Sequence, residues 1–470
     1  MFVGRESELK ALGRLYERSG FQMVVVYGRR RVGKTSLIDE FTSGKRTLYF
    51  TAKVQSSALN LRDLSVRAYS FFGMPASLPP FANWGDALGF IAERAGAERV
   101  AFVFDEFPYA AQSEPSLPSV LQEKIDHGFK QGNVFMVLCG SNQGFMEGEV
   151  LQEKSPLYGR RTGQVHLAPF DCFDAARMIP GADHEQALRY YATFGGTPYY
   201  LEQVDAKASY EENIASILFD KVGLLYEEPA MLLRQELREP ATYNSILSAI
   251  AHGATEPARI ADWSGVSPNS VGKYLKTLSG LGLVERRVPF GSNPDRSRSG
   301  VYGIADPFFA FWYRFVGPAI DAIELGAGAA VAAQTCAGQA LPTYEGAQFE
   351  RVCMQWLARK NGTDALPFLA TSFGRWWGAS PEERAVVDVD VVAASKQERM
   401  LLCGECRWRN DFDETEAISL LEKRSRLVPG RWDSRYFALF SKRAVSMGTL
   451  KKARARADLT LLSAEDLFAS

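Results

Sequence analysis

Several patterns that would place a sequence in a common class are missing from this one. The 470 residues carry a formal net charge of −1, so no general attraction to nucleic acid is expected, and any such binding must come from local patches. No apolar run is long enough to span a bilayer, and the first residues, MFVGRESELK, lack the pattern of a signal peptide. We therefore expect a soluble, cytoplasmic protein with no membrane partner.

Cysteine is also scarce, and the six cysteines form no recognisable framework for disulfides or metal. Only Cys403 and Cys406 make a C-x-x-C pair, and no second pair or nearby histidine completes a zinc site. We interpret both as ordinary buried strand residues. Hydrophobic residues, by contrast, make up 46% of the chain against 23% for charged residues, which is enough to build cores in about three domains.

Short runs rich in β-branched and aromatic residues recur through the first third of the chain, with helical patterns between them. Continuous apolar strands that alternate with helices indicate an α/β fold, in which a parallel sheet is covered on both faces. The expected strands are residues 23–27, 47–51, 100–104, 134–139 and 164–167.

The strongest motif follows the first of these strands. Residues Gly28–Thr35 match G-x-x-x-x-G-K-[ST], the P-loop that binds the phosphates of ATP, and the motif opens a predicted helix. Backbone N–H groups would hold the phosphates, Lys34 would reach the β- and γ-phosphates, and the Thr35 hydroxyl would coordinate Mg²⁺. The predicted nucleotide-binding residues of this loop are Gly28, Arg29, Arg30, Arg31, Val32, Gly33, Lys34, Thr35 and Ser36.

Polar residues end two further strands of the predicted sheet. Asp105 would hold magnesium through water, and Glu106 would polarise the attacking water. One strand, residues 47–51, is expected to separate this pair from the P-loop strand, as in the P-loop branch that uses a catalytic glutamate. Ser141 and Asn142 end the strand 134–139, where they would lie beside the γ-phosphate; a simple strand-ending turn is the alternative.

Five short motifs occur in order along the chain: FVGRE at 2–6, YGRRRVGKT at 27–35, DEF at 105–107, LYGRR at 157–161 and GGTPYY at 195–200. In this order they resemble the archaeal-type ATPase family, a branch of the AAA-like P-loop ATPases related to signalling NTPases. The resemblance covers nearly the whole chain. It implies that Val3, Gly4 and Arg5 line the adenine side of the pocket, and that Pro198, in a helical lid, touches the base.

Arg160 and Arg161, in the fourth motif, allow two hypotheses. They would meet the γ-phosphate, in cis or from a neighbouring subunit of a homo-oligomer, where an arginine neutralises charge in the transition state. Alternatively, they only pair with acids to hold the lid. The sequence leaves both open.

Residues 241–305 follow a helix-turn-helix pattern and end in a basic hairpin, which indicates a winged helix. Direct DNA binding and a role as spacer or protein contact both stay open. The residues predicted to face DNA are Asn269, Ser270, Lys273 and Lys276 on the third helix and Arg286, Arg287, Arg296 and Arg298 in the wing.

The last part of the chain, from about Leu341, resembles the C-terminal domain of the same family, which in turn looks like the PD-(D/E)XK restriction-endonuclease fold. This resemblance implies a second metal site made of Glu350 on a helix, Asp390 at the end of a strand and Glu405 on the next strand. Arg407 stands where that pattern has lysine, and arginine cannot be deprotonated. Nuclease chemistry, an inactive scaffold that binds nucleic acid and a protein-interaction module therefore all stay open.

These patterns predict a Mg-ATP-dependent ATP hydrolase that acts as a switch on its C-terminal modules. Three functions compete: an ATPase that works on nucleic acid, a signalling switch that acts through protein partners, and a nucleotide-binding scaffold with little turnover. The expected domains are a P-loop core at 1–169, a helical lid at 170–240, a winged helix at 241–305, a helical connector at 306–340 and a nuclease-like domain at 341–470.

Overall fold

The computed structural model describes residues 2–75, 77–297 and 299–469. The chain forms two compact units. Unit 1 contains the residues up to Pro169 together with Thr197–Tyr199, and unit 2 contains Phe170–Gly196 and the residues from Tyr200 onward. Among the described residues, no helix is long and apolar enough to cross a membrane.

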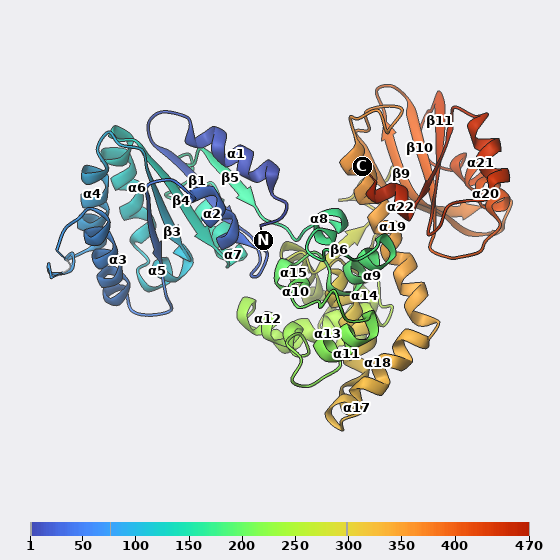
Figure 1. Cartoon of the computed structure of the whole chain (residues 1–470), viewed down its shortest axis with the longest axis horizontal. Helices are drawn as coiled ribbons and strands as arrows, with labels where there is room; N and C mark the ends of the chain where they lie inside the picture. Colours follow the sequence, from blue (N-terminus) through green and yellow to red (C-terminus); the bar gives the residue numbers. More distant parts are fainter. Residues whose placement is uncertain (1, 76, 298, 470) are drawn as a thin grey trace. The chain divides into compact units, whose positions relative to one another are not determined.

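Unit 1 is built on a parallel sheet with the strand order β2-β3-β4-β1-β5 (Figure 1). Helices cover both faces of this sheet, as the predicted α/β fold requires. The strands are β1 (Gln22–Tyr27), β2 (Thr47–Thr51), β3 (Val100–Asp105), β4 (Val134–Gly140) and β5 (Gly163–His166). The helices are α1 (Glu6–Tyr16), α2 (Lys34–Thr42), α3 (Ser57–Phe71), α4 (Trp84–Ala95), α5 (Phe107–Ser113), α6 (Leu117–His127), η1 (Phe129–Gln131), α7 (Gln143–Phe145) and η2 (Met146–Leu151).

Alternate residues of the central strands enter two separate hydrophobic cores. In β1, Met23 and Val25 pack into the core that α3, α4 and α6 complete, whereas Val24 and Val26 pack into the core that α1 and α2 complete. Every residue of β1, β3 and β4 is buried. Polar side chains can therefore reach solvent only where these strands end, and a parallel sheet brings the ends with the same polarity to one edge.

One prediction about the spatial order of the strands is wrong. The strand predicted to separate the P-loop strand from the Asp105 strand, residues 47–51, is β2, which lies at the edge of the sheet. The strand that lies between β1 and β3 is β4. Ser141, which follows β4, therefore stands between the P-loop and Glu106 along the edge of the sheet.

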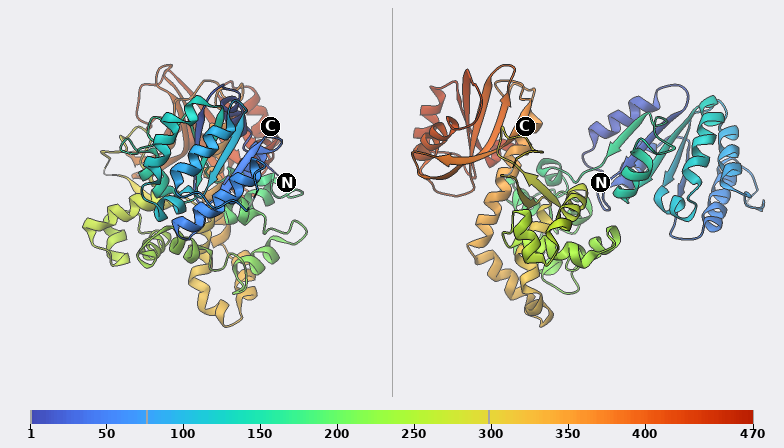
Figure 2. Two further views of the ribbon diagram at one scale, coloured as in Figure 1. Left: turned by 90° about the vertical axis from the view of Figure 1, so that its left-hand side faces the viewer. Right: turned by 180° about the vertical axis from the view of Figure 1, so that it is seen from behind.

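Unit 2 begins with helices, as the sequence predicted for residues 170–240, and continues with three helices and a two-stranded antiparallel hairpin (Figure 2). Further helices lead into the C-terminal domain. The first group comprises α8 (Cys172–Ala176), α9 (His184–Phe194), α11 (Tyr210–Leu218) and α12 (Glu228–Glu236), with α10 (Pro198–Leu201) at the boundary between the units. The second comprises α13 (Pro240–Ala251), α14 (Pro257–Ser264), α15 (Pro268–Gly280), β6 (Val284–Arg287) and β7 (Val301–Ile304). The third comprises α16 (Pro307–Phe311), η3 (Trp312–Val316), η4 (Gly317–Ala319), α17 (Ile320–Glu324), α18 (Gly328–Ala337) and α19 (Ala340–Lys360).

The C-terminal domain is a mixed five-stranded sheet with the order β12-β11-β10-β9-β8. The pairs β8–β9 and β9–β10 are antiparallel, whereas β10–β11 and β11–β12 are parallel. Asp390 does not end its strand as predicted, because β9 continues five residues further to Ser395. The elements are β8 (Ser372–Ser380), β9 (Ala385–Ser395), β10 (Met400–Arg407), α20 (Glu414–Ser425), β11 (Ser434–Ser441), α21 (Met447–Arg454), β12 (Leu459–Ser463) and α22 (Ala464–Phe468).

The loop between β6 and β7, which we call the wing loop, is docked on this sheet. Phe290 belongs to the hydrophobic core of the C-terminal domain, together with Trp376 and Leu421. Its backbone N–H donates to the carbonyl oxygen of Arg375 in β8 at 2.8 Å. At the base of the hairpin, Arg351 of α19 pairs with Glu285 at 2.9 Å. The loop between β6 and β7 therefore contributes Phe290 to the core of the C-terminal domain.

Because Phe290 fills part of that core, we expect Phe290→Ala to destabilise unit 2 by about 3–5 kcal/mol, the usual cost of deleting a buried phenyl ring. Denaturant unfolding of the two variants Phe290→Ala and Ser292→Ala measures this directly. Ser292 is exposed in the same loop, so its variant should stay within about 0.5 kcal/mol of the parent. Equal stabilities of the two variants would contradict docking of the wing loop.

Candidate nucleotide site and C-terminal carboxylate cluster

The P-loop has the backbone that phosphate binding requires. It joins β1 to α2, with left-handed φ angles of 149° at Gly28, 69° at Arg31 and 90° at Gly33. Helix α2 begins at Lys34, so the N–H groups of its first turn have no acceptor within the helix. Such N–H groups, together with the helix dipole, form an anion-binding end.

Lys34 lies inside this loop. It is 7% exposed, and its ammonium group donates to the carbonyl oxygens of Gly28 and Arg29, both at 2.9 Å. Thr35 and Ser36, which follow it, are exposed. The loop thus holds a lysine cation at its centre and presents two hydroxyls at the start of the helix.

Three arginines of the P-loop are each held by a different side chain of unit 1. These contacts tie the loop to α5 and to the tripeptide Thr197–Tyr199. Arg29 donates to the Thr197 hydroxyl at 2.9 Å, Arg30 donates to the Tyr109 hydroxyl, and the Arg31 guanidinium lies 4.6 Å from the centre of the Tyr199 ring.

Asp105 and Glu106 lie at the end of β3, as predicted. Asp105 is buried and accepts hydrogen bonds from the backbone N–H of Glu106 at 3.0 Å and from the Tyr49 hydroxyl at 3.3 Å. Burial and the charge of Asp105 raise the pKa of Tyr49 above its ordinary value, so its hydroxyl stays a donor. Glu106 has a left-handed φ of 49°, an uncommon conformation that often marks a functional residue.

Ser141 at the end of β4 holds the Glu106 carboxylate. Its hydroxyl lies 2.8 and 2.9 Å from the two carboxylate oxygens, and its backbone N–H donates at 3.3 Å. Asn142 instead caps the short helix α7 by accepting the N–H of Phe145 at 2.9 Å. In this arrangement Ser141 orients a carboxylate, while Asn142 has a local structural role.

The two segments that the family resemblance assigned to the base lie against the P-loop. Val3 is buried, and Arg5 donates to the carbonyl oxygens of Ala168 at 2.6 Å and Val32 at 3.3 Å. A Cβ atom on Gly33 would lie 3.7 Å from Cγ of Pro198. Both assignments to adenine stay predictions.

Arg160 and Arg161 have partners within unit 1. The guanidinium of Arg160 pairs with Asp126 on α6 at 2.7 Å and holds the pKa of that carboxyl to about 2. Arg161 donates to the Leu151 carbonyl at 3.2 Å and lies over the Tyr158 ring. A role toward the γ-phosphate would require Arg160 to exchange Asp126 for a phosphate.

The P-loop site fits Mg-ATP, because its donors match each part of that ligand. The helix N-terminus and Lys34 suit phosphate oxygens, and the hydroxyl of Thr35 with the carboxylate of Asp105 offers the oxygen ligands that magnesium prefers.

Gly28 lies so close to the chain at Leu167 that a Cβ atom there would stand 2.2 Å from the Leu167 carbonyl oxygen.

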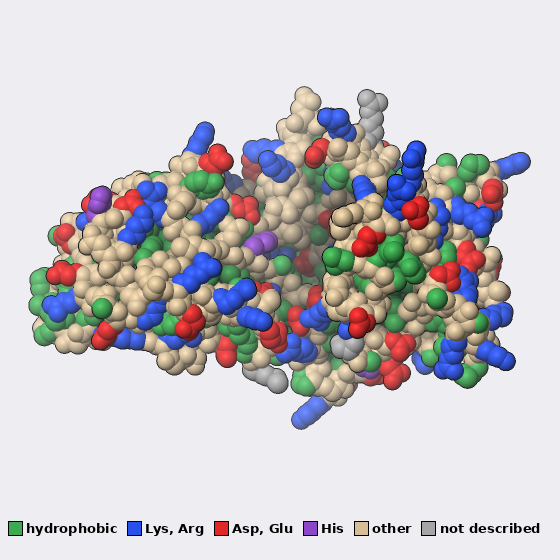
Figure 3. Space-filling model, turned by 90° about the horizontal axis from the view of Figure 1, so that it is seen from above, with side chains coloured by type: hydrophobic (Ala, Val, Ile, Leu, Met, Phe, Trp, Pro, Cys, Tyr) green, Lys and Arg blue, Asp and Glu red, His purple; other side chains and the backbone are tan. Residues whose placement is uncertain are grey.

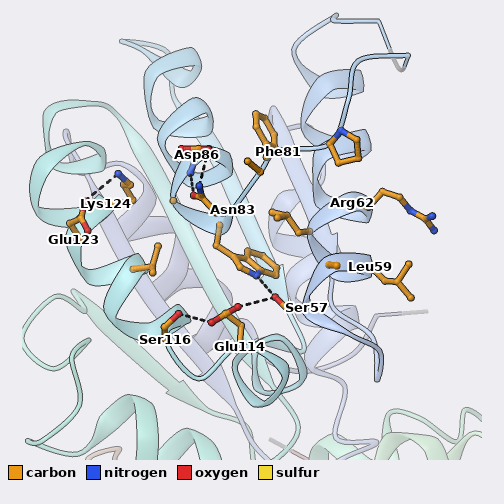
Figure 4. A pocket seen from close by; sticks show the side chains of 17 residues that line it. Ser57, Leu59, Arg62, Phe81, Asn83, Asp86, Glu114, Ser116, Glu123 and Lys124 are labelled. Atoms are coloured by element: carbon orange, nitrogen blue, oxygen red, sulfur yellow. Dashed lines mark hydrogen bonds and ion pairs between the residues drawn. The ribbon is translucent and has the colours of Figure 1, made fainter.

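A hollow of about 890 Å³ in unit 1 is lined by none of the predicted nucleotide residues (Figure 4). At its floor, Glu114 accepts hydrogen bonds from Ser57 at 3.1 Å and Ser116 at 2.6 Å, and the indole N–H of Trp84 donates to Ser57 at 2.9 Å. These polar groups satisfy one another, and we assign no ligand to this hollow.

The residues predicted to face DNA have different surroundings in unit 2. Asn269, Ser270, Lys273 and Lys276 lie exposed on α15. In the wing, Arg286 donates to the Ser297 carbonyl at 2.7 Å and Arg287 pairs with Glu285 at 2.5 Å, so both are engaged within the hairpin. Arg296 is exposed, and Arg298 lies outside the described residues.

The carboxylates predicted as a second metal site are paired with arginines. Glu350 on α19 lies 2.6 Å from Arg375 of β8, and Glu405 lies 2.6 Å from Arg407. Asp390 lies 3.8 Å from Arg375 and accepts the backbone N–H of Cys406 at 2.9 Å. Within residues 2–75, 77–297 and 299–469, no group of three or more His, Cys, Asp or Glu side chains is arranged to hold a metal ion. The residues present therefore do not fit a divalent metal here.

Burial dominates the electrostatics of this cluster. Burial and the Asp390 charge raise the pKa of Glu350 to about 8, and the same causes raise the pKa of Glu405 to about 7. Burial also raises the pKa of Cys403 to about 12 and that of Cys406 above its ordinary value; both thiols lie in β10, where Cys403 is buried and Cys406 is partly exposed.

Sequence reasoning missed several of these contacts. Arg375 lies in β8, a strand that contains Gly374 and Gly378 and that was not predicted. Asp126, Tyr109 and Thr197 lie far along the chain from the residues that they contact. In the sequence, only the two tryptophans that follow Arg375 would have drawn attention to this residue.

Because the backbone at Leu167 leaves no room for a side chain at Gly28, we expect Gly28→Ala to displace the P-loop and weaken ATP binding by at least about tenfold. Binding of a fluorescent ATP analogue measures the affinity, and thermal unfolding reports whether the fold persists. Gly13→Ala is the matched control, since nothing lies within 4 Å of a Cβ atom there. Unchanged affinity in Gly28→Ala would contradict the importance of this close approach.

Two family models match separate parts of the chain. Residues 2–204 match a model of an ATPase domain found predominantly in Archaea, and residues 312–418 match a model of archaeal and bacterial proteins of unknown function. An uncharacterized protein of Methanocaldococcus jannaschii is 30% identical over 448 residues, which cover 95% of this chain and 97% of that protein. An uncharacterized ATP-binding protein of the same organism is 46% identical over 46 residues, which cover 10% of this chain and 78% of that protein.

Among solved structures, a Walker-type ATPase of Pyrococcus abyssi aligns with a TM-score of 0.48 and 20% identity, covering 67% of this chain and 96% of that one. The P-loop lies within the residues that match the ATPase domain, and the Methanocaldococcus relative matches nearly the whole length. The chain therefore belongs to the archaeal family of P-loop ATPases and carries an ATP-binding ATPase domain.

Proposed function

We propose that this protein hydrolyses Mg-ATP in unit 1 and uses the nucleotide state to control a nucleic-acid-binding module formed by the winged helix and the C-terminal domain. The observation that carries the enzymatic part is the position of Glu106. It follows the buried strand β3, its carboxylate is oriented by Ser141, and Ser141 stands between it and the P-loop along the edge of the sheet.

Binding would use groups that are already in place. Lys34 would exchange the carbonyl oxygens of Gly28 and Arg29 for phosphate oxygens, while the N–H groups at the start of α2 hold the remaining phosphate charge. Thr35 and Asp105 would hold magnesium, which supplies charge neutralisation on the phosphates. Val3, Arg5 and Pro198 would line the base.

Hydrolysis requires a base for the attacking water. Glu106 would accept that proton, with Ser141 fixing the direction of its carboxylate. Arg160 is the candidate for stabilising negative charge in the transition state, after release from Asp126. Each of these groups lies in unit 1.

The nucleic-acid part of the proposal rests on helix α15 and on the order of elements in the C-terminal domain. Four polar or basic residues, Asn269, Ser270, Lys273 and Lys276, share the exposed face of α15. The order α19-β8-β9-β10-α20-β11 supports the resemblance to the restriction-endonuclease fold. On the face of the molecule in Figure 3, basic and acidic side chains are interspersed, so a local contact surface fits better than a broad basic field.

We expect the purified protein to hydrolyse ATP with Mg²⁺, and we expect Glu106→Gln to bind ATP but lose turnover by about 10²–10⁴-fold, because the base is removed while the phosphate site stays intact. Lys34→Ala should lose binding as well as turnover. A phosphate-release assay and an ATP-binding assay on the same samples separate the two effects. Lys10→Ala, an exposed lysine on α1, is the control. Full turnover in Glu106→Gln would overturn the assignment of the base.

We also expect duplex DNA to bind through α15, so that Lys273→Ala combined with Lys276→Ala lowers the slope of log affinity against log salt by about two. Fluorescence anisotropy at several salt concentrations measures this slope. The pair Lys207→Ala and Lys221→Ala removes two exposed lysines elsewhere in unit 2 and should leave it unchanged. If the parent protein binds no DNA with or without ATP, the competing role as a switch acting through protein partners is favoured.

A further inference from the structure

The acidic cluster of the C-terminal domain contains a cation that belongs to the chain itself. Arg375 places one guanidinium nitrogen 2.6 Å from Glu350, and another beside Asp388 and 3.8 Å from Asp390. Three carboxylates from two elements, α19 and β9, thus converge on one guanidinium group from a third element, β8. A planar group with several N–H donors satisfies such an arrangement better than a flexible lysine would.

The backbone of β8 is shaped to place this side chain. The pairing between β8 and β9 shifts register between Gly374 and Trp376, so Arg375 lies at a bulge. Bulges change the direction of a side chain and occur next to functional sites. The carbonyl oxygen of Arg375 accepts the N–H of Phe290 at 2.8 Å, and the ring of Phe290 would lie 3.3 Å from a Cβ atom on Gly374. The docked wing loop therefore contacts the bulge directly.

The wing also lines the space around the cluster. A hollow of about 380 Å³ is bounded by Arg287 of β6 together with Glu350, Arg375 and Asp390. Glu405, the remaining predicted ligand, is held by Arg407 at 2.6 Å. All the carboxylates that the nuclease resemblance would give to a metal are thus already compensated by arginine side chains.

We propose that Arg375 is the resident counter-ion of this cluster and keeps a divalent cation out of it, so that the wing loop and the β8 bulge hold a latent cation site closed. This goes beyond the proposed ATPase and does not depend on ATP hydrolysis. A divalent ion and a guanidinium group cannot both occupy the point where Glu350 and Asp390 converge, because two cations there would repel each other at short range. Removing the guanidinium leaves unpaired carboxylates, for which a divalent cation is the natural replacement.

The test is Mn²⁺ binding, followed by electron paramagnetic resonance, in full-length protein that carries Thr35→Ala and Asp105→Asn so that the P-loop site cannot bind metal. We expect no binding at micromolar Mn²⁺ in this parent, and an apparent affinity at least about tenfold higher once Arg375→Ala is added. Arg375→Lys keeps the positive charge and should bind no better than the parent. Arg409→Ala, an exposed arginine just after β10, is the matched control.

Two further variants test where the ion binds and replace Arg375→Ala if that variant does not fold. Adding Glu350→Gln and Asp390→Asn to Arg375→Ala should abolish the gained binding, which shows that the ion lies at this cluster. Arg375→Gln, closer in size to arginine, repeats the experiment if Arg375→Ala unfolds, and Mn²⁺ should raise its melting temperature. Mn²⁺ bound by the parent at this cluster, or no gain in a folded Arg375→Ala or Arg375→Gln variant, would overturn the proposal.

Discussion

The complete burial of β1, β3 and β4 is the constraint on which the rest of unit 1 depends. A strand that is buried on both faces cannot carry a charged side chain along its length without a large desolvation cost, so chemistry is confined to the residues at or just beyond its carboxyl end. The P-loop, the Asp105–Glu106 pair and Ser141 all occupy such positions. Their proximity follows from the parallel direction of the strands and from the place of β4 between β1 and β3.

In unit 2, by contrast, charged side chains are paired with one another within the C-terminal domain. Its acidic residues form a partly buried cluster, and the chain supplies arginines from β8 and β10 to compensate them. Removing one member of a buried ion pair costs far more than the pair itself contributes, because the remaining charge is left without a partner. Arg375 is therefore a structural requirement of the cluster as well as its counter-ion, and its position depends on the wing loop.

The sequence predicted the parts of the structure that local patterns determine. The P-loop motif, the five apolar strands and the acidic end of β3 are each readable within a few residues, and the structure has strands at 22–27, 47–51, 100–105, 134–140 and 163–166. The spatial order of the strands was not readable, because it depends on pairing between distant segments. The Glu106–Ser141 contact and the docking of Phe290 could not be predicted either, because they also join segments that are distant in the sequence. Glycines within β8 broke the alternation that would have revealed that strand and the role of Arg375.

Thr197–Tyr199 belongs to unit 1, so an isolated ATPase domain would need this tripeptide in addition to the residues up to Pro169. The tripeptide supplies Thr197 as the acceptor for Arg29 and Tyr199 as the aromatic face over Arg31, although both neighbouring segments belong to unit 2. Unit 1 is therefore assembled from two pieces of chain that are separated by Phe170–Gly196. A fragment that stops at Pro169 would contain the whole sheet and the whole P-loop motif. It would lack Thr197 and Tyr199, which contact two arginines of the P-loop. The expected boundary at residue 169 thus coincides with the end of the main piece of unit 1, and Thr197–Tyr199 adds a second, short piece.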